Sequence, residues 1–259
     1  MPRSEGYVSA DYLRRMAELL QAYKQRTYAL MALGAGDRVL DAGCGPGMDT
    51  VPMAGLVGET GRVVGIDIDE AMLSQADAQA RQAGVSHNVE HRLADINALP
   101  FDDASFDAVR AERLFQVLPA SCPPERVMGE LRRVLREGGR IVLADTDWAS
   151  ASVHHPDTAL ERRLMQFFAA TMRPNGYAGR QFLDLLGTAG FEDVAVEAHA
   201  FVHRDYAQTP FGDWLVGEAV KAGIASAGEM AAWQTDLSER NREGRFYASV
   251  NMVIASGRR

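Results

Sequence analysis

The segment VLDAGCGPGMDT (Val39–Thr50) constrains the fold more than any other part of the chain. Apolar and small residues run into Gly43, Gly45 and Gly47, an order typical of a buried strand that turns into a helix. Glycines allow a tight turn and a close approach of a ligand, and a helix beginning near Met48 offers free N–H groups. The sequence therefore predicts a ligand-binding loop after a first strand.

An acidic residue, Asp41, ends this strand directly before the glycines. A dinucleotide fingerprint spaces its glycines as GxGxxG, whereas this loop reads GCGPG and continues with Met48. A carboxylate here repels a pyrophosphate, but it suits a ligand that carries an ammonium or sulfonium charge and one carboxylate for the helix N-terminus. S-adenosylmethionine (SAM) has this combination of charges, so we expect SAM rather than a nicotinamide dinucleotide.

Apolar segments alternate with helical ones in a rhythm that predicts a doubly wound, mostly parallel sheet. A helix is expected over residues 9–33, and another between Pro123–Pro124 and Gly138–Gly139. Strands are expected at residues 38–43, 61–68, 88–95, 106–112 and 140–148. Ligands of such sheets bind beyond the carboxyl ends of the strands, where the acidic residues of this chain fall.

The last hundred residues follow a different pattern. We expect a helix at 179–191 and strands at 193–202 and 245–257. Residues 150–175 and 203–244 are too long for plain connections. We expect both segments to form helical lid insertions around an acceptor site, with simple padding as the alternative.

Two further acids follow strands and fit the same ligand. Asp67 ends the second strand, where one carboxylate reaches paired ribose hydroxyls. Asp95 follows the third strand and is expected to accept from the adenine amino group. Neighbouring apolar residues are expected to line the adenosine, namely Ile68, Met72, Ala94 and Ile96. Taken singly, each acid is equally explained as a helix cap or turn residue.

Four segments resemble, in order, the motifs of class I SAM-dependent methyltransferases of the small-molecule, ubiquinone/menaquinone-type branch. They are VLDAGCGPG, VVGIDIDEAML, RLADINALPFDDASFDAVRAERLFQVL and LRRVLREGGRIVLADTDW. The resemblance implies a Rossmann-like seven-stranded sheet of order 3-2-1-4-5-7-6 with strand 7 antiparallel. It also implies that the methionine part of SAM meets Asp41, Gly43, Cys44, Gly45 and Gly47, the ribose Asp67, and the adenine Asp95.

The segment RAERLFQVL after the fourth strand departs from the commoner family pattern, which has small or apolar residues there. Arg110 or Arg113 is expected to pair with the SAM carboxylate or with Glu112, and Arg113 is alternatively a surface helix residue. Together with DTDW, this segment resembles a bacterial subgroup that methylates secondary metabolites.

The acceptor is expected under the lid, next to the end of the fifth strand. Asp147 and His154 are the candidate catalytic residues, because a histidine can act as a general base at neutral pH. Tyr7, Trp148, His155, Asn175, Arg180 and Trp214 are the candidate substrate-binding residues. The alternatives are that the histidines face water in a loop and that the aromatic residues are core of the cap. Metal-ligand spacing is missing, so no metal is expected.

Charge and cysteine content limit the other classes of function. The net charge of −8 and the pI near 5.3 argue against a nucleic-acid surface. Two cysteines form no disulfide framework, and the sequence has no signal-like or bilayer-length apolar run, so we expect a cytoplasmic protein without a membrane partner.

We expect a single methyltransferase domain over residues 1–259, with a helical cover at 1–33 and a SAM-binding core at 35–148. The expected function is transfer of a methyl group from SAM to O, N or C of a small aromatic or heterocyclic molecule, leaving S-adenosylhomocysteine, by a monomer or homodimer. The alternatives are a SAM-binding enzyme of another reaction type, such as a cyclase, and a non-catalytic ligand-binding module.

Overall fold

A seven-stranded sheet of order β3-β2-β1-β4-β5-β7-β6 forms the centre of the protein in a computed structural model that describes residues 20–259. The strands are β1 Arg38–Ala42, β2 Arg62–Asp67, β3 Val89–Leu93, β4 Phe106–Glu112, β5 Leu135–Val153, β6 Glu192–His203 and β7 Ala248–Arg258. Strands β1 to β5 pair in parallel, and β7 pairs antiparallel with both β5 and β6. The predicted strand order and the antiparallel seventh strand are confirmed.

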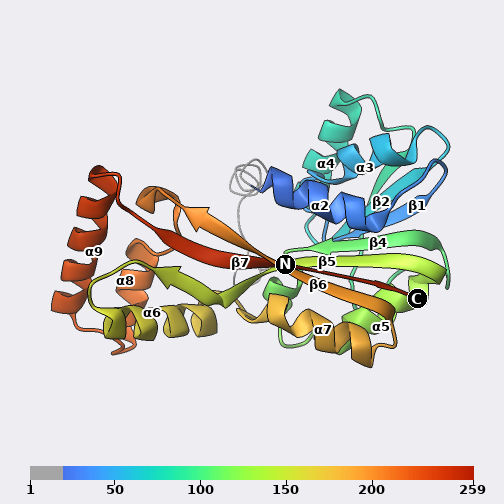
Figure 1. The fold of residues 1–259 in the computed structure, drawn as a ribbon. Coiled ribbons are helices and arrows are strands. Elements are labelled where there is room, and N and C mark those ends of the chain that lie inside the picture. Colours follow the sequence, from blue (N-terminus) through green and yellow to red (C-terminus); the bar gives the residue numbers. More distant parts are fainter. Residues whose placement is uncertain (1–19) are drawn as a thin grey trace.

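Helices cover both faces of this sheet (Figure 1). One face carries α2 (Gln21–Met31), α3 (Thr50–Val57) and α4 (Glu70–Gln82), and the other carries α5 (Pro124–Val134), α7 (Ala178–Thr188) and the short η1 (Phe115–Val117). Amphipathic spacing explains α5, because its buried residues are Val127, Met128, Leu131 and Val134. Asp69 caps α4 by accepting from the N–H groups of Ala71 and Met72.

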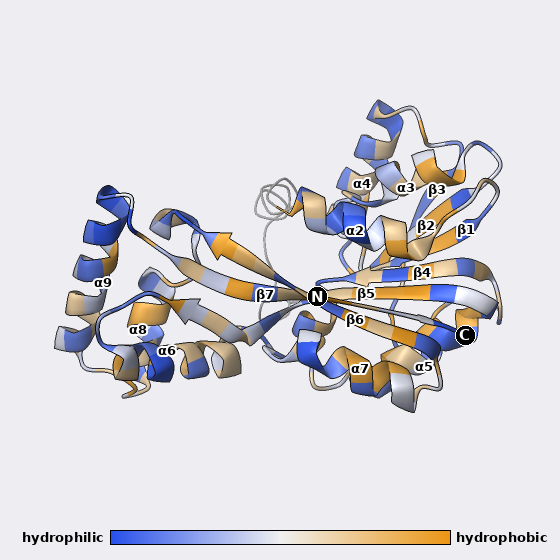
Figure 2. Cartoon of the chain, in the orientation of Figure 1, coloured by the Kyte–Doolittle hydropathy of each residue, from blue (hydrophilic) through white to orange (hydrophobic). Residues whose placement is uncertain are grey.

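Three strands extend past the shared sheet and carry a second lobe, seen at the left of Figure 1. Helices α6 (Thr158–Thr171), α8 (Asp213–Lys221) and α9 (Ala227–Arg242), with η2 (Tyr206–Gln208), pack around the ends of β5, β6 and β7. Phe168, Phe211 and Trp233 are fully buried in the separate apolar core of this lobe. Apolar colour gathers on the strands and inner helix faces in Figure 2. Both predicted insertions, 150–175 and 203–244, contribute residues to this lobe.

Two boundaries that differ from the sequence prediction lie next to each other, at the end of α5 and in β5. Helix α5 ends at Val134, before Gly138–Gly139, and β5 runs from Leu135 to Val153 rather than over 140–148. The additional length arises because Ser152 and Val153 pair with β7 beyond a bulge that follows Asp147. Residues 1–19, which include Tyr7 and most of the predicted helical cover, lie outside the described residues.

Candidate functional site

The glycine loop between β1 and α3 is held by backbone hydrogen bonds to β2. The N–H groups of Gly43 and Cys44 both donate to the carbonyl of Ile66, at 2.9 and 2.8 Å, and Gly47 N–H donates to Cys44 O at 3.0 Å. Gly47 has φ +80°, and a Cβ there would lie 2.8 Å from that of Ala76 on α4. Only glycine fits this close contact in the left-handed region, so the loop packs directly on α4.

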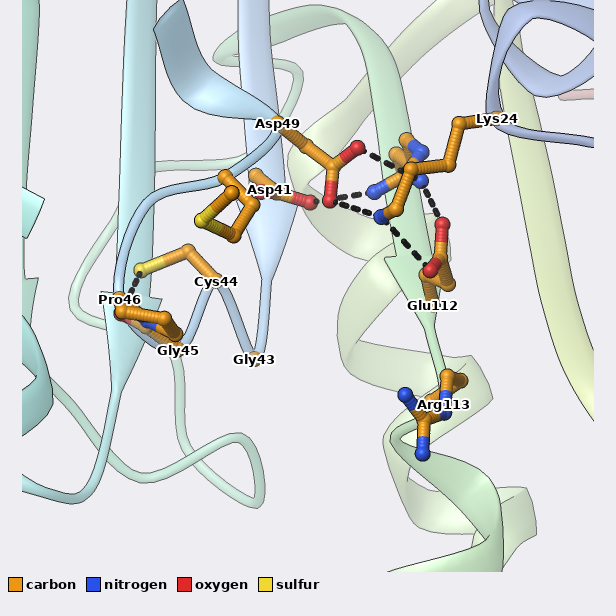
Figure 3. A pocket seen from close by; sticks show the side chains of 11 residues that line it. Lys24, Asp41, Gly43, Cys44, Gly45, Pro46, Asp49, Glu112 and Arg113 are labelled. Atoms are coloured by element: carbon orange, nitrogen blue, oxygen red, sulfur yellow. Dashed lines mark hydrogen bonds and ion pairs between the residues drawn. The ribbon is translucent and has the colours of Figure 1, made fainter. Parts of the chain in front are cut away.

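A buried ion cluster lies beside the loop, and we define it as Lys24, Asp41, Asp49, Arg110 and Glu112 (Figure 3). Lys24 Nζ contacts Asp49 Oδ2 at 2.6 Å and Glu112 Oε1 at 2.7 Å. Arg110 contacts Asp41 Oδ1 at 3.3 Å and Asp49 Oδ1 at 3.2 Å, and it also pairs with Glu112. Two cations thus face three carboxylates, which leaves one carboxylate of the cluster for a cationic group of a ligand.

Helix α2 completes the cluster from the other side. Thr27 accepts from Arg110 Nε at 3.2 Å, and the Tyr28 hydroxyl donates to Asp49 Oδ1. Burial and the Asp49 carboxylate raise the pKa of Tyr28. Burial favours the neutral form of Asp49, but Arg110 and Lys24 outweigh it and hold the pKa of Asp49 below its usual range. Asp49 is therefore an anion that two cations hold in place.

Asp41 differs from the other two acids of the cluster. Its Oδ1 contacts Arg110, but its buried Oδ2 has no hydrogen-bond partner among the described residues. Burial raises the pKa of Asp41 to about 7, and the neighbouring Arg110 lowers it only partly. An unpaired buried carboxylate oxygen is costly, and a cationic donor from a ligand would satisfy it.

These residues line a pocket with an empty volume of about 440 Å³. The lining residues are Lys24, Asp41, Gly43, Cys44, Gly45, Pro46, Met48, Asp49, Arg110, Glu112 and Arg113. The structure thus brings together the cofactor-site predictions for Asp41, Gly43, Cys44, Gly45, Arg110 and Arg113, and Gly47 lies in the same loop.

Arg110 and Arg113 occupy different parts of this pocket. Arg110 is 1% exposed and bonded to the acids of the cluster, including Glu112, which was one of the predicted alternatives. Arg113 lies apart from the cluster in Figure 3 and has φ +56°, uncommon for a residue with a side chain. Its N–H donates to Ala144 O at 2.7 Å, which fixes the backbone at the end of β4.

Asp67 lies at the end of β2 next to the glycine loop. Its Oδ2 accepts from Gly45 N–H at 2.9 Å and its Oδ1 accepts from Asp69 N–H at 3.0 Å. Burial raises the pKa of Asp67, although these backbone donors oppose the shift. Each oxygen retains a lone pair for another donor, so the carboxylate can bind a hydroxyl pair while it holds the loop.

The predicted adenosine contacts gather around the ends of β2 and β3. Ala94 N–H donates to Asp67 O at 3.1 Å, which joins the two strand ends. Asp95 is exposed and accepts from the backbone and side-chain amides of Asn97. Ile68 is 65% exposed, a large apolar side chain left open beside Asp67, whereas Met72 and Ile96 are buried.

Part of the predicted acceptor set meets at Gln116, which follows β4. Gln116 Oε1 accepts from Trp148 Nε1 at 2.8 Å, and Gln116 O accepts from Asn175 N–H at 3.1 Å. Gln116 N–H donates to the buried Asp145, whose pKa burial raises to about 7. This network lies where the strands leave the shared sheet for the second lobe.

Asp147 and Arg180 form a bidentate ion pair. Arg180 Nε contacts both oxygens of Asp147, at 2.9 and 3.0 Å, and Nη2 contacts Oδ2 at 2.8 Å. The Asp147 side chain is 8% exposed and that of Arg180 is 49% exposed. This geometry fixes the carboxylate at the edge of the junction between the lobes.

The two predicted histidines lie away from the pocket. His154 follows β5 ten positions beyond Ala144, which is about 30 Å at about 3.3 Å per residue. It is exposed, as the loop alternative expected, and a role as base at the transferred methyl group has no geometric support. His155 instead is buried, bonded through Nδ1 to Asp157 N–H at 3.1 Å and packed against Trp233.

Trp214 lies on α8 in the second lobe, 42% exposed and edge-on to Phe168. Trp214 thus matches neither a residue buried in the core of the cap nor a residue that only faces a substrate, because its ring packs on the lobe core and is also in contact with solvent. Among residues 20–259, no His, Cys, Asp and Glu side chains are grouped as a metal site would need. In the same part of the chain, no helix combines the length and apolar character of a membrane span.

Five residues that line the pocket were not among the predicted cofactor contacts, namely Lys24, Pro46, Met48, Asp49 and Glu112. Lys24 and Tyr28 are spaced i, i+4 on α2, so polar groups on one otherwise apolar helix face were the available signal. Asp49 follows the last glycine by two positions and reads locally as an ordinary helix cap. Its pairing with α2 arises only from tertiary packing.

Comparison with known families decides the class of protein. A family model described as a methyltransferase domain matches residues 33–180, more than half of the chain. The chain belongs to this methyltransferase family. The resemblance to class I SAM-dependent methyltransferases is thereby confirmed.

Two curated relatives illustrate the range of the family. The chain is 34% identical over 252 residues to an uncharacterized 37.1 kDa protein in transposon TN4556 of Streptomyces fradiae, covering 94% of this chain and 69% of the relative. It is 38% identical over 135 residues to 27-O-demethylrifamycin SV methyltransferase of Amycolatopsis mediterranei, covering 52% of this chain and 48% of the relative. The chain thus spans about half the length of that named methyltransferase.

A solved structure supports the fold at low sequence identity. The geranyl diphosphate C-methyltransferase of Streptomyces coelicolor, in complex with Mg²⁺, geranyl diphosphate and S-adenosyl-L-homocysteine, superposes with a TM-score of 0.59 at 18% identity. The match covers 96% of this chain and 82% of that chain. Both lobes are therefore included in the similarity.

Proposed function

We propose that this methyltransferase moves the methyl group of SAM to O, N or C of a small aromatic or heterocyclic molecule. The reaction class rests on the family. The observation that carries the donor site is Asp41 Oδ2, a buried carboxylate oxygen without a partner among the described residues, beside the glycine loop. An ammonium group is the donor that such an oxygen fits.

The donor is held along the carboxyl ends of β1, β2 and β3. Asp41 accepts from the ammonium group, the glycine loop follows the methionine chain, and Asp67 accepts from the ribose hydroxyls. Ile68 and Asp95 flank the adenine, together with Met72, Ala94 and Ile96. When bound, SAM supplies an electrophilic methyl group. The acceptor attacks this group in line with the sulfonium sulfur, and S-adenosylhomocysteine leaves.

Arg113 binds the carboxylate of the donor. Arg110 already contacts three carboxylates, so its guanidinium serves to position Asp41 and the other acids of the ion cluster. Arg113 lines the same pocket from the end of β4, where a rigid backbone directs its side chain. A planar guanidinium matches a carboxylate in geometry and charge.

The acceptor binds at the junction between the sheet and the second lobe. Trp148 and Asn175 are joined there through Gln116, and Asp147 with Arg180 lies at the edge. Aromatic side chains favour a planar acceptor. Alignment and exclusion of water supply much of the rate of an in-line transfer, and Asp147 is the carboxylate placed to orient an acceptor hydroxyl or amine.

The proposed kind of substrate, cellular location and type of metabolism rest on charge and on the relatives. A net charge of −8 and a small-molecule site support action on a metabolite rather than a nucleic acid. We place the enzyme in the cytoplasm and in secondary metabolism, as a monomer or homodimer. The relative that methylates 27-O-demethylrifamycin SV supports this choice of metabolism.

Calorimetry tests the donor site. S-adenosylhomocysteine should bind and NAD should not, and Asp67→Ala should weaken binding at least tenfold, because the ribose loses a charged acceptor. A protein that binds NAD instead, or an Asp67→Ala variant with unchanged affinity, would remove the proposal. Isotope-labelled SAM with a panel of phenols, hydroquinones and imidazoles then separates methyl transfer from the cyclase and binding-module alternatives.

A further inference from the structure

A chain of polar contacts under the glycine loop connects it to β3 and α4. The Thr50 hydroxyl, at the start of α3, donates to Gly47 O at 3.1 Å and lies 3.1 Å from His91 Nε2. His91 Nδ1 lies 2.8 Å from Asp77 Oδ1 on α4. Asp77, His91, Thr50 and the carbonyl of Gly47 thus form one line of contacts from the surface to the backbone of the loop.

The line is buried at its inner end, which makes its hydrogen bonds directional and costly to lose. Thr50 is 0% exposed and the His91 side chain is 1% exposed, whereas the Asp77 side chain is 49% exposed. Burial closes the Thr50 hydroxyl to any substrate, so this Thr–His–Asp arrangement has no nucleophilic function. The arrangement can therefore act on a ligand only through the glycine loop, which Thr50 contacts at Gly47 O.

The protons of the line can be assigned from the chemistry of its members. A carboxylate only accepts, so His91 Nδ1–H donates to Asp77. The Thr50 hydroxyl has one proton and lies within hydrogen-bond distance of both Gly47 O and His91 Nε2, so it links the ring to the loop carbonyl.

The position of the His91 ring under the loop depends on Gly65 of β2. A Cβ at Gly65 would lie 2.8 Å from both His91 Cδ2 and Cys44 Sγ. The missing side chain thus leaves space for the ring directly beneath the loop residue Cys44. This explains a glycine in the middle of an otherwise apolar strand.

The inner end of the line acts on the peptide between Gly47 and Met48. In a trans peptide the carbonyl and the next N–H point in opposite directions, so a fixed Gly47 O turns Met48 N–H away from Thr50. Met48 lines the pocket. Gln79 on α4 holds the preceding carbonyl, Pro46 O, at 2.8 Å, so two successive carbonyls of the loop are fixed from below.

We propose that His91 is a positioning residue for donor binding: through Thr50 it orients the Gly47–Met48 peptide of the glycine loop. The inference rests on the proposed binding of SAM at this loop. His91 touches neither donor nor acceptor, and its effect is on affinity for the donor.

Two amide substitutions separate the two nitrogens of His91. The amide of His91→Gln reaches the position of Nε2 and keeps a donor for Thr50, whereas that of His91→Asn reaches the position of Nδ1 and keeps only the Asp77 contact. The Kd for S-adenosylhomocysteine should rise about five- to tenfold in His91→Asn and less than about threefold in His91→Gln, since one net hydrogen bond is at stake.

Thr50 supplies the matched pair. Thr50→Val keeps the shape and removes the hydroxyl, so Kd should rise about five- to tenfold, and Thr50→Ser should restore binding. The double variant Thr50→Val/His91→Asn should bind no worse than the weaker single variant, because both break the same line. Glu90→Gln, at a partly exposed acid on the same strand that pairs with Arg92, is the control and should leave Kd unchanged.

A merely structural role predicts a different pattern. In that case His91→Gln and His91→Asn lose equal thermal stability and bind the ligand equally, and the two Thr50 variants also bind alike. Either result overturns the inference while wild-type binding stands. If the wild-type protein itself binds no S-adenosylhomocysteine, the proposed function fails instead, so the two failures are distinguishable.

Discussion

Replacing Asp41 with asparagine tests the electrostatics of the pocket most directly. The substitution keeps size and one acceptor oxygen but removes the charge that faces the ligand ammonium group. A hydrogen bond to a charged group contributes about 1.5–3 kcal/mol. Since 1.4 kcal/mol is a tenfold change, Kd for S-adenosylhomocysteine should rise about 10- to 100-fold in Asp41→Asn.

The same substitution should leave the fold intact or make it more stable. Burial raises the pKa of Asp41 to about 7, above its value in the unfolded chain. A raised pKa in the folded state stabilises the protein below about pH 4, and this contribution is lost as the pH rises to about 7. At pH 8 the loss is at most about 4 kcal/mol, and Asp41→Asn avoids it.

Two assays then give opposite signs for one variant, weaker binding by calorimetry and an equal or higher Tm at pH 8. Wild-type affinity should also fall about tenfold per unit below pH 7, because the ligand binds the ionised carboxylate, and Asp41→Asn should lack this dependence. Unchanged affinity in Asp41→Asn would contradict a charged Asp41 at the ligand. So would a wild-type Kd that is flat between about pH 5.5 and 7, the range just below the expected midpoint of about 7.

Three further variants probe the other parts of the molecule. Lys24→Met should lower the free energy of unfolding by about 3–5 kcal/mol in urea, because Asp49 and Glu112 lose a buried partner; a loss below about 1 kcal/mol would contradict the ion cluster. Asp147→Asn should reduce kcat and leave Kd for S-adenosylhomocysteine unchanged; equal rates would exclude it from the acceptor site. Phe168→Ala should lower stability by about 3–5 kcal/mol and Tm accordingly, since its ring is fully buried in the second lobe, and an unchanged Tm would show that this core is not packed as described.

Sequence reasoning reached the sheet and the donor loop because both depend on local patterns. The strand order follows from the family motifs, and the acids Asp41 and Asp67 are adjacent in sequence to the strands that place them. The ion cluster could not be predicted in the same way, since Lys24 and Asp49 are joined only when α2 packs against the sheet. A buried ion pair leaves no local periodicity.

The end of β5 shows a second limit. The segment RIVLADTDW predicts a fifth strand that ends at Trp148, which would leave His154 close to the acceptor site. Pairing with β7 continues past the bulge instead, and each added residue moves the chain about 3.3 Å further away. A long-range partner, not local propensity, decided where the strand ends.

The extension of β5, β6 and β7 beyond the shared sheet gives the helices of the second lobe an apolar cluster of their own. Two other apolar clusters pack on the sheet that carries the glycine loop. Mutations that reshape the second lobe are therefore expected to leave the glycine loop in place. Such a division lets an enzyme change its acceptor during evolution while its methyl source stays the same.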